Sequence, residues 1–229
     1  MSKRLIVLLM MCLTFPINAY AYDQTSSLSD SGGINKIWHF NAILDDDPIG
    51  FHRFELTKKN SVTHIKTTAE FDIKFLFMTV YSYRHSNHEV WESSCLTAMN
   101  SRTDDNGEDL FVAIDKQDQV LRIDTPNSSV ANDSCLKIFA YWDIELIQSN
   151  TLLNSQTGEL NDMTLTFVGE EEIKAMNKVV NAKRYKLLGK GVEIDLWYSL
   201  TNEWLGLQSI LDNGSQLKYT LVENVEATK

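Results

Sequence analysis

The chain has 229 residues, of which 31 are acidic and 21 basic, so its formal net charge at pH 7 is −10. So acidic a chain disfavours nucleic acids and anionic membrane surfaces as partners, because both are bound through clustered lysine and arginine. Its length is enough for one domain with a sizeable core.

The first residues have the features of an export signal. Lys3 and Arg4 precede an apolar run over 5–15, and a tripeptide AYA that ends at Ala21 supplies the small-x-small pattern of signal peptidase sites. The run is too short for a transmembrane helix, and no later stretch is long and apolar enough for one. We expect a signal peptide over 1–21, cleaved after Ala21, and no transmembrane anchor. Loss of the two basic residues changes the net charge from −10 to −12.

The rest of the chain begins with a polar segment and continues with strand patterns. Residues 22–36 are rich in Gly and Ser and predict a flexible lead-in. Apolar and polar residues then alternate over 38–44, as in a half-buried strand, and DDDP at 45–48 predicts a turn before a second strand. We expect residues 37–225 to form a single antiparallel β domain.

Turn signals divide the domain into many short segments. DNG at 105–107 and at 212–214 is typical of hairpin turns, and residues 170–180 favour a hairpin that turns near Asn177. Helical periodicity is scarce, although residues 143–153 are compatible with one short helix. About a dozen strands without βαβ spacing predict an all-β, mainly antiparallel meander, which we expect to curl into an open or closed β-barrel.

Two cysteines, Cys95 and Cys135, remain after the signal peptide. A bond between them would close a loop of about 40 residues and stabilise the fold by about 4 kcal/mol. The alternatives are a catalytic cysteine or a metal site, but neither cysteine has a CxxC partner or a nucleophile motif around it. In an exported protein this pattern favours a disulfide.

The stretch YSYRHSNHEVW, residues 81–91, carries His85, His88 and Glu89 within five positions. In a continuous strand His85 and Glu89 face one side and His88 the other, so the two histidines cannot share a metal. They would meet only if the chain reversed at Ser86-Asn87, which is a poor sequence for a two-residue turn. We therefore predict no metal site and no cofactor.

The odd positions of this region form an aromatic stripe with a polar end. In a barrel with a cavity, such a stripe could bind an apolar body while the polar groups fix one end. The alternative is an ordinary packed core with hydrogen-bonded polar residues at its rim. The candidate ligand-binding residues are Phe71, Phe75, Phe77, Tyr81, Tyr83, His85, Glu89 and Trp91, with Asn87 on the same face.

Several ordered strings resemble a known family. EVWESSCL, SRTDDNG, AYWD, LLNSQTGE, RYKLLG and LWY, which lie between Trp38 and Val222, are similar to exported bacterial proteins classed only as a domain of unknown function. The resemblance implies a periplasmic location in a Gram-negative bacterium and no assigned activity or catalytic residue. The long-stranded meander also resembles, as a fold, the half-open barrels of periplasmic lipoprotein carriers.

These observations predict a non-enzymatic periplasmic binding or carrier protein for an apolar or amphipathic, lipid-like ligand. One alternative is an envelope interaction or assembly protein with a filled barrel. The other is a hydrolase that uses His85 and Glu89 with a polar loop at 154–159; no catalytic motif supports it. The sequence names no protein partner.

Overall fold

A computed structural model describes residues 36–226, except 118–119 and 212, and the expected signal peptide lies outside them. The regular elements of this part are all strands: β1 (Lys36–Leu44), β2 (Asp47–Lys59), β3 (Val62–Phe75), β4 (Met78–Glu92), β5 (Cys95–Asp105), β6 (Glu108–Gln117), β7 (Val120–Asp124), β8 (Ser129–Asn132), β9 (Thr151–Leu153), β10 (Leu160–Ala175), β11 (Lys178–Gly189), β12 (Val192–Ser199), β13 (Trp204–Ile210) and β14 (Gln216–Glu226).

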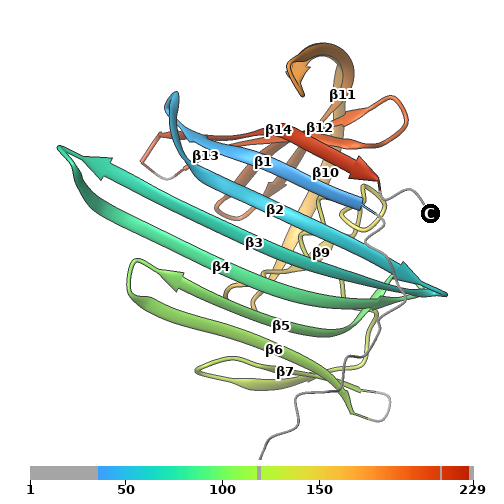
Figure 1. Cartoon of the computed structure of the whole chain (residues 1–229). Coiled ribbons are helices and arrows are strands. Elements are labelled where there is room, and N and C mark those ends of the chain that lie inside the picture. The colour runs from blue at the N-terminus through green and yellow to red at the C-terminus, as the bar shows by residue number, and fades with distance from the viewer. Residues whose placement is uncertain (1–35, 118–119, 212, 227–229) are drawn as a thin grey trace, which may run out of the picture. The chain divides into compact units, whose positions relative to one another are not determined.

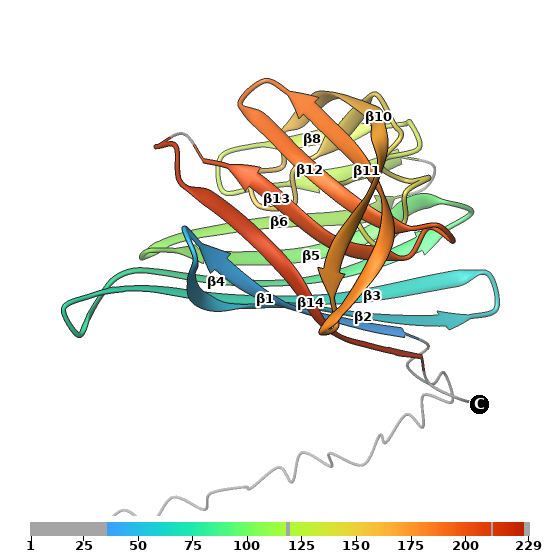
Figure 2. The same cartoon turned by 90° about the horizontal axis from the view of Figure 1, so that it is seen from above.

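The fourteen described strands form one antiparallel sheet, which confirms the all-β prediction. Their order in space is β8 to β1 followed by β14 to β9, so two meanders are joined by the pairing of β1 with β14. Figures 1 and 2 show the sheet folding over so that the two meanders face each other. The end strands β8 and β9 are not hydrogen-bonded neighbours. The barrel is therefore open.

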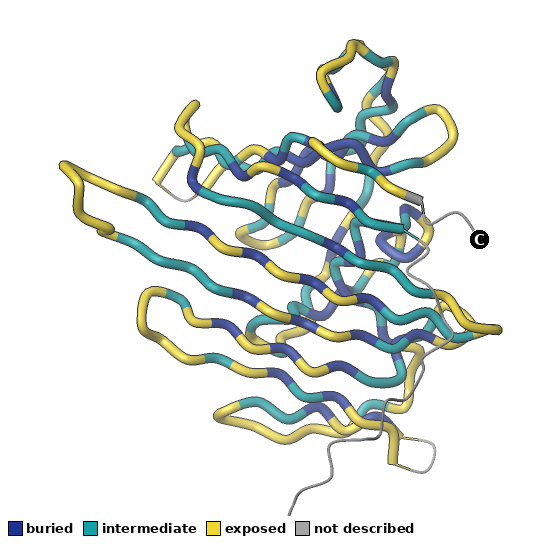
Figure 3. Tube along the Cα trace, viewed as in Figure 1, coloured by how far each residue is buried: buried dark blue, intermediate teal, exposed yellow. Residues whose placement is uncertain are grey.

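Alternating burial gives the sheet a distinct inner face. Along the middle of β3, β4 and β5 the tube in Figure 3 alternates between buried and exposed residues, as the pleat of a half-buried strand requires. One apolar cluster includes Trp38, Phe40 and Trp204, where β1 meets the second meander. A second cluster includes Trp91 and Ile114 of the first meander. Long strands that bury one face in this way explain the curled sheet.

The segment between β8 and β9, residues 133–150, fills part of the interior, and we call it the inner segment. Its path corrects one expectation. Residues 141–150 form turns, not the short helix predicted for 143–153. Ile144, Leu146 and Ile147 are buried, and the amides of Asp143 and Leu146 donate to carbonyl oxygens three residues earlier, at 3.0 and 3.2 Å, as in turns. The side chain of Asp143 also accepts a hydrogen bond from the amide of Glu145 at 2.9 Å. These local contacts replace helical hydrogen bonds.

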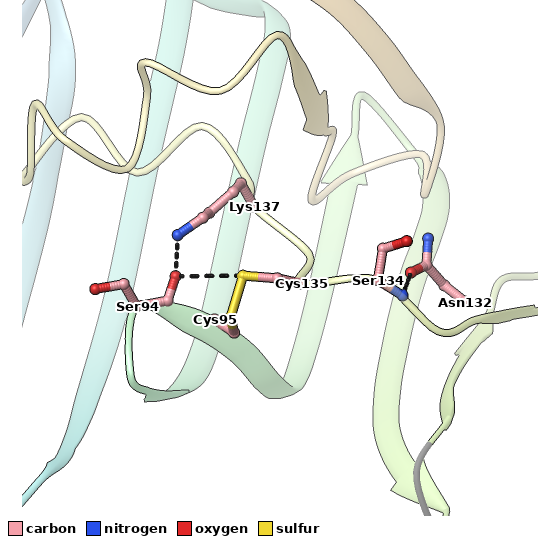
Figure 4. The surroundings of a disulfide bond; sticks show 6 residues. All are labelled: Ser94, Cys95, Asn132, Ser134, Cys135 and Lys137. Carbon is pink, nitrogen blue, oxygen red and sulfur yellow. Dashed lines mark hydrogen bonds between the residues drawn. A yellow bond between two sulfur atoms is a disulfide. The ribbon is translucent and has the colours of Figure 1, made fainter.

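The same segment is tied to the sheet by the predicted disulfide (Figure 4). Cys95 begins β5, and Cys135 lies 40 residues later with its Cα 5.0 Å away. Beside the bond, Lys137 Nζ donates a hydrogen bond to the carbonyl oxygen of Ser94. The covalent link therefore holds the start of the inner segment against the turn between β4 and β5.

Most of the expected turns are present, but the turn at 76–77 was not foreseen. Asn106-Gly107 joins β5 to β6, and residues 176–177 join β10 to β11, as predicted. The aromatic stripe that starts at Phe71 does not lie on one continuous strand, because the chain reverses at Leu76-Phe77, where β3 ends and β4 begins. In the part of the chain that is described, no helix is long and apolar enough to span a membrane.

Candidate functional site

The register of β4 answers the question raised by its two histidines. The strand runs without reversal from Met78 to Glu92, so His85 and Glu89 are buried on the inner face while His88 lies outside. His88 stacks instead on His64 of β3, with ring centroids 5.7 Å apart. His85 and His88 therefore do not share a site. Within the described ranges no group of three or more His, Cys, Asp or Glu side chains could hold a metal ion.

A pocket of about 250 Å³ opens on the inner face, between the sheet and the inner segment. Its polar side carries two histidines, a buried carboxyl group and the turn that follows β9. Its apolar side consists of aromatic and branched side chains. The lining residues are His52, Phe54, Tyr83, His85, Glu89, Ile138, Phe139, Tyr141, Asn154, Ser155, Gln156, Val192, Ile194 and Tyr219.

Two small residues, Ala42 and Gly50, lie side by side in the sheet near the pocket. Ala42 of β1 pairs with Gly50 of β2 on one side and with Tyr219 of β14 on the other. Gly50 has a φ of +150°, and a Cβ there would lie 1.8 Å from the carbonyl oxygen of Glu70, so glycine is required. Rings from β2, β3 and β14, those of Phe54, Phe71 and Tyr219, gather around His52 in the same part of the sheet.

His52 lies at the centre of this ring cluster. Its ring stacks on Phe54 at a centroid distance of 4.3 Å and meets the edge of Tyr219 at 5.3 Å. Part of the residue's surface is accessible, but both ring nitrogens are covered, and neither has a hydrogen-bond partner among the described residues. Burial, with His85 as a second cause, lowers the pKa of His52 to about 3. The imidazole is therefore neutral at pH 7.

His85 and Glu89 are both buried but are engaged separately. His85 Nδ1 lies 2.8 Å from Thr103 Oγ1, and burial lowers its pKa to about 4. Glu89 accepts hydrogen bonds from Asn87 Nδ2 at 2.8 Å and from Trp91 Nε1 at 2.7 Å. Burial raises the pKa of Glu89 to about 7, against the opposing effect of the Trp91 hydrogen bond. At neutral pH both histidines of the pocket are therefore neutral, while Glu89 is about half ionised.

The turn after β9 brings its own polar groups to the pocket. Asn154 Oδ1 accepts the amide of Gln156 at 2.8 Å, which fixes the start of the turn, and Gln156 Nε2 then donates to Tyr83 Oη. Burial raises the pKa of Tyr83 to about 12, so its hydroxyl stays protonated. The Tyr83 ring stacks on Phe71 with centroids 5.1 Å apart. The expected polar loop at 154–159 thus lies beside His85 and Glu89.

The sequence candidates divide into three groups. Tyr83, His85 and Glu89 line the pocket, while Phe71 and Asn87 support them from beside it. Trp91 is buried in the second cluster, and Tyr81 donates to Asp105 Oδ1 at 2.7 Å; neither lines the pocket. Phe75 and Phe77 are exposed at the turn, so the structure removes them from the proposed ligand wall.

The aromatic stripe is partly packed core, as the alternative interpretation held. Sequence reasoning also missed His52, Tyr219 and Tyr141. His52 had a detectable signal, since it alternates with Gly50 and Phe54 and so shares the inner face of its strand. Tyr141 had none, because the path of an irregular segment follows from packing.

Comparisons with known proteins were consistent with this architecture. The family model described as "Domain of unknown function (DUF6134)" matches residues 40–222. No match was found among curated proteins. Among solved structures, the fold is similar to a crystal structure from Brucella abortus, titled a beta-barrel-like protein of domain of unknown function DUF1849. The TM-score is 0.64 at 7% identity, over 86% of this chain and 99% of that one. At this identity the likeness concerns the fold alone.

Proposed function

Because this chain belongs to the DUF6134 family, a domain of unknown function, its role has to be inferred from the pocket, and we propose that it is an exported, periplasmic, non-enzymatic binding protein. Its ligand is an apolar or amphipathic, lipid-like molecule that enters the open barrel. The observation that carries the proposal is the pocket itself, which sets aromatic and branched side chains beside polar groups and includes His52, whose two covered ring nitrogens have no hydrogen-bond partner among the described residues.

A ligand can supply what the protein leaves unsatisfied at this point. A buried polar group without a partner destabilises a fold, and each such group in a native protein calls for an explanation. A hydroxyl group that reached His52 would accept a hydrogen bond from its N–H or donate one to its other nitrogen, and an amide or ester carbonyl oxygen would accept from the N–H only. Binding therefore gains the most from a ligand with a polar but uncharged end.

The charge state of the pocket selects the same ligand class. His52 and His85 are neutral at pH 7, because burial lowers both pKa values. No fixed cation stands among the lining residues to hold a phosphate or a carboxylate. The rings of Phe54 and Tyr219 and the side chain of Ile194 offer apolar contacts to the rest of the molecule. At about 250 Å³ the pocket holds one end of a lipid-like molecule, since pockets for whole drug-sized ligands span about 300–1,000 Å³.

Filling the pocket tests the proposal. We expect Ser155→Trp, which adds a large side chain at a lining position, to weaken binding of a fluorescent long-chain fatty alcohol at least tenfold. Thr157→Trp, on the exposed side of the same turn, is the matched control and should bind like the natural chain. Fluorescence titration gives both affinities, and native mass spectrometry of protein purified from its source identifies any co-purified ligand.

Two other outcomes would overturn the proposal. Equal affinity of the two tryptophan variants would place probe binding elsewhere, and a bare protein that binds no probe would favour the filled-barrel interaction protein. A hydrolase remains the second candidate, since His85, Glu89 and Ser155 border one pocket. In that case His85→Ala would abolish hydrolysis of an acyl ester probe while leaving the protein folded.

A further inference from the structure

The hairpin of β3 and β4 extends beyond the sheet that supports it. β2 pairs with β3 only as far as Gly50 opposite Phe71, and β5 pairs with β4 only as far as Asp105 opposite Tyr83. Beyond these pairs the two strands form a ribbon with no other strand beside it among the described elements. Figure 1 shows this ribbon projecting on the left past the neighbouring hairpins. A two-stranded ribbon on its own is only marginally stable, so its length calls for a function.

The end of the ribbon is entirely apolar. We call its four residues, Phe75, Leu76, Phe77 and Met78, the apolar tip. Leu76 is 70% exposed, and Phe75 and Met78 are each 63% exposed, while Phe77 is fully exposed. Val80, two positions further along β4, is also exposed. These side chains form the densest group of exposed large apolar residues in the described part of the chain, and nothing there covers them.

Two residues of the tip adopt positive φ values that bulky side chains disfavour. Leu76 and Phe77 have φ values of 45° and 70°, a region that favours Asn, Asp or Gly. The other turns of the described chain use such small or polar residues at positive φ, for example Asn106 and Ser94. Met176 is the one other bulky exception, and it packs against the core. Leu76 and Phe77 make no such contact, so packing does not explain them.

The surroundings of the tip fit the boundary of a lipid bilayer. Lys74 adjoins the tip, and Asp72, two residues before it, is paired with Arg84 at 2.9 Å. Asp45 and Asp47 line a hollow together with Lys74. Tyr81 lies three residues behind Met78, about 10 Å at the rise of a strand. An aromatic ring with a polar end prefers the headgroup level, and an apolar surface of this kind is buried about 5–10 Å into the interface.

The shape of the tip separates a bilayer from a protein partner. A stable protein interface buries about 800 Å² on each side with close complementarity, which a narrow convex tip of four residues does not offer. A fluid leaflet adapts to such a tip. We infer that the apolar tip inserts into the interface of a lipid bilayer and docks the protein on a membrane surface. Because the chain is acidic and Lys74 is the one cation at the tip, apolar burial drives the docking.

Changing only the turn tests this inference without endangering the fold. The double variant L76N/F77G places the preferred hairpin sequence at the same positive φ values, so its thermal stability should equal or exceed that of the natural chain. Its partition coefficient onto phosphatidylcholine vesicles should fall at least tenfold, because two bulky apolar side chains are lost. Leu200→Ser removes a leucine exposed on another turn and should leave the partition coefficient unchanged.

Salt and lipid charge distinguish insertion from surface attraction. Partition onto phosphatidylcholine should not depend on salt between about 0.05 and about 0.5 M, a range over which salt screens charges increasingly. Partition should weaken when the anionic lipid phosphatidylglycerol is added. In Phe77→Trp, the fluorescence of the new indole should shift to shorter wavelength with vesicles. Unchanged partition of L76N/F77G, or an unshifted Phe77→Trp spectrum, would overturn the inference. So would tip-dependent dimers by sedimentation without vesicle binding, since these would make a second copy the partner.

The docking does not depend on the proposed ligand pocket. Ser155→Trp should keep full vesicle binding while losing the fatty alcohol probe, and L76N/F77G should do the reverse. Both variants share the same N-terminal segment with the natural chain, so its contribution to vesicle binding is equal in all of them.

Discussion

At the scale of single residues, the protonation of buried Glu89 changes the free energy of folding. Its pKa is raised from 4.5 in a model peptide to about 7, because burial penalises the carboxylate more than the hydrogen bond from Trp91 favours it. The folded state therefore prefers the protonated acid. It follows that this group's contribution to stability is greatest below pH 4.5 and is lost as pH rises toward 7.

Replacing Glu89 with glutamine should remove this pH dependence. Between pH 4.5 and 7 we expect the free energy of unfolding of E89Q to rise relative to that of the natural chain by about 1.4 kcal/mol for each pH unit. Above pH 7 the difference should stay constant. Urea denaturation of both proteins at several pH values measures the difference. His52 and His85 have lowered pKa values, so their contribution to the stability of the fold is lost as pH falls below 6.5. This effect should be the same in both proteins. Two parallel pH profiles would contradict the prediction.

Residue-level prediction succeeded where strand periodicity decides which way a side chain faces. The alternation in β4 placed His85 and Glu89 inside and His88 outside. A bulge between Ile73 and Lys74 keeps the odd residues of β3 opposite those of β4, so the stripe stays on one face despite the unforeseen turn. The partners of these residues could not be read from the sequence, since Gln156 reaches Tyr83 from 73 positions away.

At the scale of elements, the inner segment depends on the disulfide for its position. Cys95 and Cys135 are 40 residues apart in the chain, so the bond restricts the unfolded chain substantially. We expect C95S/C135S to lower the free energy of unfolding by about 4 kcal/mol. Guanidinium denaturation of oxidised protein and of the double variant measures the change. A loss below about 1 kcal/mol would show that noncovalent packing of the inner segment is sufficient.

A strand boundary could be predicted from the sequence where its turn contains residues that favour positive φ. Asn106-Gly107 has the residues that positive φ demands, and its hairpin was foreseen. Leu76-Phe77 adopts the same region with side chains that avoid it, so no local pattern marked that turn. The helix expected over 143–153 is absent for another reason, because Thr151–Leu153 pair with β10 as strand β9 and tertiary burial of residues such as Ile147 overrides local propensity.

At the scale of the whole molecule, Trp204 joins three parts of the fold. It is fully buried on β13 and contacts the ring of Phe40 on β1 at 4.3 Å, Phe54 on β2 at 5.0 Å and Tyr141 of the inner segment at 5.6 Å. We expect Trp204→Ala to destabilise the protein by about 3–5 kcal/mol, as other large cavities do. Because one sheet crosses both meanders, calorimetry should still show a single transition. Two separate transitions would indicate that the meanders unfold independently.

The pairing of β1 with β14 also sets the order in which the fold can be completed. The strand that opens the domain finds its second neighbour only in Gln216–Glu226, near the end of the chain. During synthesis from the N-terminus, the edge of β1 that pairs with β14 therefore stays unpaired until those residues are made, and Trp38 and Phe40 lack the packing that the second meander supplies. Nascent chains stalled before residue 216 are thus the form of this protein most in need of a chaperone.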